Sequence, residues 1–444
     1  MLHKRIKIDT ANVAKGMYVA QLDCSWLVTP FIQRGFEVSN DNELELLRKF
    51  CKFVYVDASR STVSEKHIES AHNDSGSIAD PFSETRIQRI RTSSPPAKSI
   101  WRIFRFLKPS AAKQKPSKST EFNSVAVEAP LAMDAYVAAR AAMEQVVKGV
   151  EKGRPINIDL LHHGVAPMIE SVQRNADAMA WLGFMRKRER GAFVYTMTRA
   201  VWAVIMGRSM GLEGRRLSNL VVGALLLDIG NVQIPETISG KDGPLTQEEF
   251  DIVKMHVDYG IEIIEKSPGI SQEILDMVRF HHERLDGSGY PQGCEGDEIP
   301  PFGRIAGVID SYDAMISKRP YASQKCAYDA VRTLNQSAGV EFQKEVIEQF
   351  IRAIGMFPTG SLVELNTGEV ALVVQQDRHH RLRPVVMVLR DASKQPVPSG
   401  KEIELSKLPD KPGHKKARWI VGGFEAGSFN IDPRDYFLKS QSAA

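Results

Sequence analysis

Three histidines and two aspartates near the middle of the chain are of the residue types that bind metal ions. His281 and His282 are adjacent in FHHERLDGSGYP, and His256 lies upstream in VKMHVDYG. Asp228 follows an apolar run in LLLDIGN, and Asp310 lies in VIDSYDAM. Any one of these histidines alone would fit an ordinary core or surface position. Together, neutral imidazoles and hard carboxylates suit Fe, Mn or Zn, and one carboxylate with three imidazoles would complete a four-ligand site.

Helices must position these residues. Apolar residues recur at intervals of three and four through most of residues 128–355, as in AYVAARAAMEQVVKGV and LSNLVVGALLLDI, and Gly or Pro falls mostly between such runs. This period is typical of helices that bury one face. We therefore predict a mainly α fold, in which an all-helical domain over 128–355 carries the candidate site.

Two smaller domains are expected on either side of the helical one. In residues 1–60, two strand-like segments, 15–23 and 52–59, enclose the helix-like DNELELLRKFCKF, which predicts a small α/β or α+β domain. In residues 356–410, SLVELNTGEVALVVQQ and RPVVMVLRDA alternate with period two around an Asn-Thr-Gly turn, which predicts a small β appendage. Residues 411–444 are rich in Lys, Pro, Gly and Ser, and we expect a loosely attached tail.

A basic linker is expected over residues 61–125, where Ser, Pro, Lys and Arg predominate. Residues 86–119 carry ten Lys or Arg and no Asp or Glu, whereas the rest of the chain has 48 basic and 54 acidic residues. Because the basicity is local, it argues against binding to a nucleic acid polymer. The stretch IWRIFRFLK (100–108) predicts either weak contact with a membrane surface or a partner, or packing against its own protein.

Composition also indicates a compartment. The first residues, MLHKRIKIDT, are not followed by the apolar segment of a secretory signal, and no 18-residue apolar run exists. The four cysteines are scattered without a C-x-x-C spacing, which fits reduced packing thiols rather than a disulfide framework. We therefore expect a cytoplasmic protein.

The order of these motifs resembles the HD-GYP domain, a branch of the HD metal-dependent phosphohydrolases that hydrolyses cyclic di-GMP. The resemblance covers roughly residues 191–354 and is most specific at 281–293, where HHERLDGSGYPQG stands intact. Residues 16–31, GMYVAQLDCSWLVTPF, are similar to the small domain of unknown function that often precedes HD-GYP domains. The resemblance implies a metal-dependent phosphodiesterase, and contacts with diguanylate cyclases through the GYP loop.

The resemblance implies a role for each matching metal ligand. Asp228 matches the aspartate that bridges two metal ions in the family. His256, His281 and His282 match the remaining ligands of one ion. Asp310 matches a ligand of the other ion.

It also implies roles around the substrate. Arg319, in KRPY, matches an arginine that holds a substrate phosphate, for which paired, charge-assisted hydrogen bonds give the physical reason. Asp286 is expected to support catalysis by orienting the histidine pair. Gly289, Tyr290 and Pro291 form the GYP motif, and Tyr290 is counted with the substrate-binding residues.

Several positions depart from the family's pattern. Leu227 stands where the family has the histidine of its HD pair, and Asn231 stands where it has a nearby lysine. The histidine expected on the upstream helix is replaced by Tyr195 or, with a register shift of one turn, by Arg199, and residues 164–255 contain no histidine. We therefore expect one well-bound divalent ion (Fe, Mn or Zn) and a weak or absent second one.

Two functions follow from this pattern. The first is metal-dependent hydrolysis of cyclic di-GMP to pGpG or GMP with impaired activity, since losing one of two ions removes several kcal/mol of transition-state stabilisation. The alternative is a non-catalytic cyclic di-GMP receptor, or a scaffold that binds partners through the GYP surface. A third and weaker alternative is hydrolysis of another nucleotide phosphodiester.

Overall fold

The computed structural model describes residues 5–23, 36–38, 41–63, 68, 123–185, 192–241, 243–317, 324–377, 380–409, 414 and 416–437. These residues form two compact units. Most of the expected linker, including 100–108, lies outside the described residues, and so does Arg319. Within the described part, no helix is long and apolar enough to cross a membrane.

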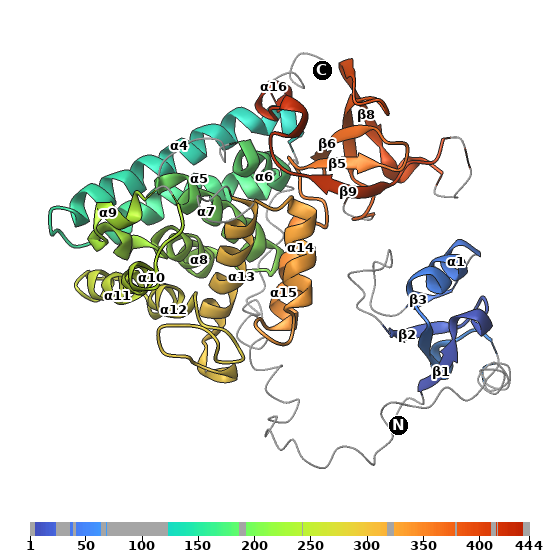
Figure 1. Cartoon of the computed structure of the whole chain (residues 1–444), viewed down its shortest axis with the longest axis horizontal. Coiled ribbons are helices and arrows are strands. Elements are labelled where there is room, and N and C mark those ends of the chain that lie inside the picture. The colour runs from blue at the N-terminus through green and yellow to red at the C-terminus, as the bar shows by residue number, and fades with distance from the viewer. Residues whose placement is uncertain are drawn as a thin grey trace, which may run out of the picture. The chain divides into compact units, whose positions relative to one another are not determined.

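The N-terminal unit is a small sheet with one helix (Figure 1). Its strands, in sheet order, are β1 (Arg5–Asp9), β4 (Phe53–Asp57), β2 (Tyr18–Leu22) and β3 (Phe36–Glu37), and all pairings are antiparallel. Helix α1 (Asp41–Phe50) buries Leu47 against Ile8 and Val54 of the sheet. The expected mixture of strands and one helix is confirmed, with antiparallel pairing throughout.

The second unit contains the predicted helical domain. Its helices are α4 (Val125–Val150), α5 (Ile158–Arg174), α6 (Ala176–Met185), α7 (Ala192–Ser209), α8 (Gly214–Leu226), α9 (Glu236–Ser239), α10 (Gln247–Lys254), α11 (His256–Glu265), α12 (Gln272–Phe280), α13 (Pro301–Ile316), α14 (Ala327–Gln336) and α15 (Lys344–Ile354). Several begin at a residue whose side chain accepts a hydrogen bond from the first turn, such as Ser124, Asn157 and Ser271.

Helix α7 lies in the interior of this bundle and packs against α6, α8, α13 and α15 (Figure 1). Its Trp202 is fully buried and meets Phe184 and Tyr312 edge to face at 5.5 Å each, and Tyr312 in turn meets Phe350 at 5.0 Å. These aromatic contacts tie four helices together and add to the burial of their rings. Any polar side chain of α7 that faces these helices is therefore shielded from water.

The predicted β appendage is an antiparallel sheet with strand order β8 (Pro396–Glu404), β7 (Val385–Arg390), β6 (Val370–Gln375), β5 (Leu362–Leu365) and β9 (Ile420–Phe424). Gly368, at φ 81°, completes the expected turn between β5 and β6. Asp177 of α6 accepts hydrogen bonds from the Thr359 hydroxyl (2.5 Å) and the Gln376 amide (3.3 Å), which links the sheet to the helices.

One sequence expectation at the C-terminus is wrong. Residues 420–424 were expected in a loose tail, but they form β9 and pair with β5, and the short helix α16 (Arg434–Phe437) follows. The segment contains two glycines and shows weak apolar alternation, so its sequence alone does not indicate a strand. The hydrogen-bonding edge of β5 supplies the missing constraint.

Candidate metal centre

Short elements at the ends of helices carry the candidate ligands. Asp228 follows α8 and precedes a 3-10 turn (Ile229–Gln233), His256 is the first residue of α11, and His281 and His282 follow α12. The turn lies directly on α11, because a Cβ added to Gly230 would be 2.0 Å from the His256 carbonyl oxygen. This close approach of two backbones brings Asp228 to His256.

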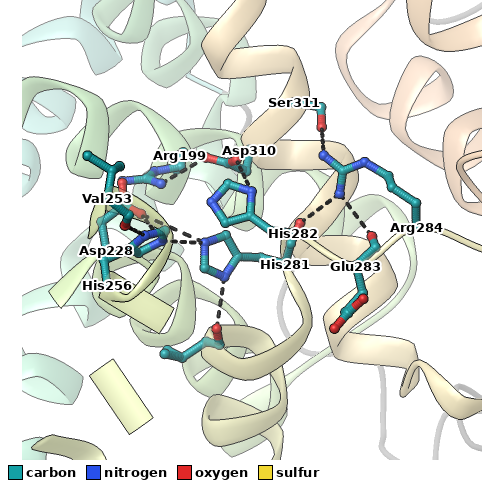
Figure 2. A network of polar contacts seen from close by, with 11 residues as sticks. Arg199, Asp228, Val253, His256, His281, His282, Glu283, Arg284, Asp310 and Ser311 are labelled. Carbon is teal, nitrogen blue, oxygen red and sulfur yellow. Dashed lines mark hydrogen bonds and ion pairs between the residues drawn. The ribbon is translucent and has the colours of Figure 1, made fainter. Parts of the chain in front are cut away.

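Four side chains converge on one point (Figure 2). One ligand atom from each of Asp228, His256, His281 and His282 lies within 4.8 Å of the other three. The Nε2 atoms of His256 and His281 are 3.3 Å apart, and Asp228 Oδ1 is 3.3 Å from the first and 3.7 Å from the second. Ligands about 2.1 Å from a tetrahedral ion lie roughly 3.4 Å from one another. The donor set therefore fits one divalent ion of the Fe, Mn or Zn kind.

Backbone carbonyl groups orient two of the imidazoles. His256 Nδ1 donates a hydrogen bond to the Val253 carbonyl at 2.7 Å, and His281 Nδ1 donates to the Val278 carbonyl at 2.9 Å (Figure 2). Since a carbonyl only accepts, both protons are on Nδ1, and both Nε2 lone pairs point into the cluster. This is the arrangement that fixes the tautomer of metal-binding histidines.

The charges of the cluster also favour a cation. Burial lowers the pKa of His256, and burial with the neighbouring imidazoles holds the pKa of His282 well below its usual value. Burial alone would raise the pKa of Asp228, but the positive charge of Arg199 outweighs it and holds that pKa well below its usual range. At neutral pH His256 and His282 are therefore neutral imidazoles and Asp228 is a carboxylate, which are the protonation states that bind metal.

A buried arginine occupies the other side of Asp228. Arg199 of α7 is 2% exposed; its Nη2 donates to Asp228 Oδ2 at 2.7 Å and its Nη1 to Asp310 Oδ1 at 2.9 Å (Figure 2). Burial alone would lower the pKa of Arg199, but the two carboxylates outweigh it and raise the pKa above its ordinary value. Asp310, expected as a metal ligand, is thus an ion-pair partner here, and its other oxygen is 3.9 Å from His282 Nδ1.

The GYP loop holds Tyr290 over the metal centre. The Tyr290 ring stacks on the ring of His282, with centroids 4.5 Å apart and planes at 22°. Buried Glu283 accepts hydrogen bonds from the amides of Gln292 (2.8 Å) and Cys294 (3.0 Å), which closes the loop. A Cβ at Gly289 would be 2.5 Å from the His282 carbonyl oxygen, so only glycine permits this path.

Two further residues illustrate what sequence reasoning missed. Asp286 does not orient the histidines as expected, because its exposed carboxylate accepts hydrogen bonds from the amide and hydroxyl of Ser288 at 3.1 and 2.7 Å. Arg284 was not singled out, yet its guanidinium donates to the carbonyls of His281 (3.1 Å) and Glu283 (2.9 Å) and to the Ser311 hydroxyl (3.3 Å) (Figure 2). It braces the histidine pair against α13.

Three known protein domains match parts of the chain. Residues 163–346 match the HD domain, residues 5–161 match a domain of unknown function, DUF3391, and residues 362–410 match a KOW domain associated with HD domains. The chain therefore carries an HD domain, with a DUF3391 domain before it and a KOW domain associated with HD domains after it.

Curated relatives align with this chain over different lengths. The chain is 27% identical over 397 residues to a cyclic di-GMP phosphodiesterase of Pseudomonas aeruginosa, covering 88% of this chain and 87% of that protein. It is 40% identical over 148 residues to a cyclic di-GMP phosphodiesterase of Thermotoga maritima, covering 33% and 40%. It is 34% identical over 164 residues to a 3'3'-cGAMP-specific phosphodiesterase of Vibrio cholerae, covering 37% and 31%.

Proposed function

We propose that this chain is a metal-dependent phosphodiesterase that hydrolyses cyclic di-GMP to pGpG or GMP. The observation that carries the proposal is the convergence of Asp228, His256, His281 and His282 within 4.8 Å, with an ionised Asp228 and neutral His256 and His282. The relative aligned along most of its length is a cyclic di-GMP phosphodiesterase.

The position of each residue in the centre determines its proposed role. His256 and His281, with Asp228 Oδ1 and His282, would hold one ion, of Fe, Mn or Zn. When bound, the ion supplies Lewis acidity to a phosphate oxygen and lowers the pKa of water. The Tyr290 ring, stacked on His282, offers an aromatic face beside the centre on which a guanine base could stack.

The proposal includes reduced turnover. A phosphodiesterase with two ions stabilises both the attacking and the leaving oxygen, whereas this chain offers a full ligand set for one ion. Each 1.36 kcal/mol of lost stabilisation is about tenfold in rate, so a loss of several kcal/mol gives a reduction of about 10³-fold or more.

The remaining sequence expectations belong to this proposal. Arg319 is proposed to hold a substrate phosphate, and the GYP loop is proposed to contact diguanylate cyclase domains. A cytoplasmic location and weak membrane contact through residues 86–119 remain predictions, and the latter residues lie outside the described part of the chain.

A turnover measurement with two substrates tests the function. The purified chain, loaded anaerobically with Mn²⁺ or Fe²⁺, is incubated with cyclic di-GMP or with 3'3'-cGAMP, and the products are separated over hours. We expect pGpG or GMP from cyclic di-GMP, abolished in Asp228→Asn and retained in Asp134→Asn, which makes the same chemical change at an exposed position of α4. Preferred cleavage of 3'3'-cGAMP would correct the substrate. No cleavage of either substrate by the metal-loaded chain would refute the enzyme and favour the receptor.

A further inference from the structure

The two carboxylate oxygens of Asp228 face different partners: one faces the site where a metal ion fits, and the other faces Arg199. Its Oδ1 faces the Nε2 atoms of His256 and His281, where one metal ion fits, and its Oδ2 accepts the 2.7 Å hydrogen bond from Arg199. In a two-metal centre, the second oxygen of such a bridging carboxylate binds the second ion. In this chain a guanidinium group stands there.

Asp310 contacts the same guanidinium group as Asp228, through the other terminal nitrogen of Arg199. Its Oδ1 accepts the 2.9 Å hydrogen bond from the other terminal nitrogen of Arg199, so the planar guanidinium bridges two carboxylates as a divalent ion would. Arg199 is 2% exposed, so its single positive charge offsets one of the two carboxylate charges of Asp228 and Asp310 inside the protein rather than through water.

The residue that precedes Asp228 offers no ligand to a second ion. Leu227, next to Asp228, is fully buried and apolar. A guanidinium has five donors and no lone pair available for a metal, and it stays protonated at all relevant pH values. It therefore supplies fixed positive charge at this position, but it cannot activate water.

We infer that the Arg199 side chain takes the place of the second metal ion, holding Asp228 and Asp310 and restricting the centre to a single ion. The inference deepens the proposed function and rests on it for the identity of the first ion. Arg199 thus has a positioning and charge-balancing role. A single substitution of Arg199 should therefore change the number of ions bound per chain.

Metal stoichiometry tests the inference directly. The chain is stripped with a chelator and dialysed against Mn²⁺, and the ions per chain are counted by elemental analysis. We expect one ion for the native chain and one more for Arg199→Gln, because the substitution frees Asp228 Oδ2 and Asp310 Oδ1. Arg199→His, which adds an imidazole ligand, is also expected to gain one ion. Arg199→Lys, which keeps the charge, is expected to gain none.

A matched control separates this effect from the loss of any buried ion pair. Arg174 donates two 2.9 Å hydrogen bonds to the fully buried Glu128, far from the centre in sequence and on other helices. Without metal, Arg199→Gln and Arg174→Gln should each lower the melting temperature by about 10 °C, since each leaves buried carboxylate charge unbalanced. Mn²⁺ should raise the melting temperature of Arg199→Gln by more than it raises that of Arg174→Gln, because both variants keep the four-ligand site but only Arg199→Gln gains a second ion.

A substitution at Asp310 tests the inference while leaving Arg199 unchanged. Asp310→Asn should leave the count of bound ions unchanged, because Asp310 is held by Arg199 rather than by the ion. A lower count in Asp310→Asn, or an unchanged count in Arg199→Gln and Arg199→His, would overturn the inference. A native chain that binds no ion would instead refute the proposed function, while a gain of one ion in Arg199→Gln would still support the role of Arg199.

Discussion

At the scale of single residues, the centre depends on which nitrogen of each histidine carries the proton. The carbonyls of Val253 and Val278 fix the protons of His256 and His281 on Nδ1, so that both Nε2 atoms face Asp228. The exposed fractions fall from 31% for the Asp228 side chain to 18% for His282, 4% for His256 and none for His281. An ion therefore reaches the centre past Asp228 and His282, and the deeper imidazoles complete its coordination.

His256→Asn should weaken metal binding strongly while leaving the helices folded. Changing a residue that only supports a ligand costs about 10- to 100-fold in metal affinity, and loss of the ligand itself should cost at least that. Calorimetric titration of the stripped chain with Mn²⁺ measures the change. His163→Asn, the same substitution at an exposed position, should bind with native affinity. Equal dissociation constants for the two variants would exclude His256 as a ligand.

At the scale of elements, the centre depends on how closely the turn after α8 approaches α11. Gly230 has no room for a side chain, because a Cβ there would lie 2.0 Å from the His256 carbonyl oxygen and 2.5 Å from the Gly260 amide nitrogen. Both of these atoms belong to the backbone, so neither can move aside without shifting α11. The element contact thus sets the distance between Asp228 and His256.

Gly230→Ala should destabilise the chain by about 1–3 kcal/mol or more and weaken metal binding, since the turn must move away from α11. Denaturant unfolding of the stripped chain measures the first effect, and Mn²⁺ titration the second. Gly149→Ala, in α4, is the control, because its Cβ would meet only Arg154 Cβ at 3.9 Å and alanine favours helix. Native metal affinity in Gly230→Ala would show that this contact does not position Asp228.

His162 connects α5 to α8 and should make stability depend on pH. Its Nδ1 is 2.5 Å from the Ser218 hydroxyl, its Nε2 is buried without a hydrogen-bond partner, and burial lowers its pKa to about 4. Above pH 6.5 the ring is neutral in both the folded and the unfolded chain. Between pH 6.5 and about 4 only the unfolded chain takes up the proton, so the free energy of unfolding falls as the pH falls.

Substitution isolates this contribution from those of the other histidines. In urea unfolding of the stripped protein, the native chain should lose about 1–3 kcal/mol more than His162→Asn between pH 7 and pH 4. His256 and His282 titrate in both proteins, so their effects cancel in the difference. Parallel pH profiles for the two proteins would show that His162 is protonated in the folded state as readily as in the unfolded chain.

At the scale of the whole molecule, metal binding at the proposed centre should be coupled to folding of the helical unit. The four ligands come from the segment after α8, the start of α11 and the end of α12, which meet only when the bundle has formed. An ion that binds only the folded state adds stability in proportion to the logarithm of its concentration. The buried Trp181 and Trp202 of the same unit report its unfolding by fluorescence.

Mn²⁺ at 100 times its dissociation constant should add about 2.7 kcal/mol, and thus raise the melting temperature of the stripped chain by roughly 5–10 °C. Thermal melting followed by tryptophan fluorescence measures the shift. Asp228→Ala, which removes the central carboxylate, should show little or no shift at the same Mn²⁺ concentration. A shift of equal size in the variant would place the stabilising ion elsewhere.

The sequence by itself determined much of this protein. Apolar residues at intervals of three and four predict the helices, because that pattern indicates which face of each helix must be buried. The HHExxDGSGYP segment determines the path of the GYP loop, because Gly289 and the two adjacent histidines are only a few residues apart in the chain. His256, His281 and His282 were predicted together as metal ligands from their residue types and from the resemblance to HD-GYP domains, and their convergence with Asp228 agrees with that prediction.

Only the tertiary structure decided the partners of the remaining polar groups. Arg199 and Asp310 are 111 residues apart, and nothing local in either segment indicates that one guanidinium bridges Asp310 and Asp228. Asp286, close to the histidines in sequence, bonds to Ser288 instead. Residues 420–424 become a strand only because β5 offers an unpaired edge. Local periodicity specifies elements, whereas a buried charge takes whichever partner the packing of distant elements brings within reach, because an unpaired one would cost too much.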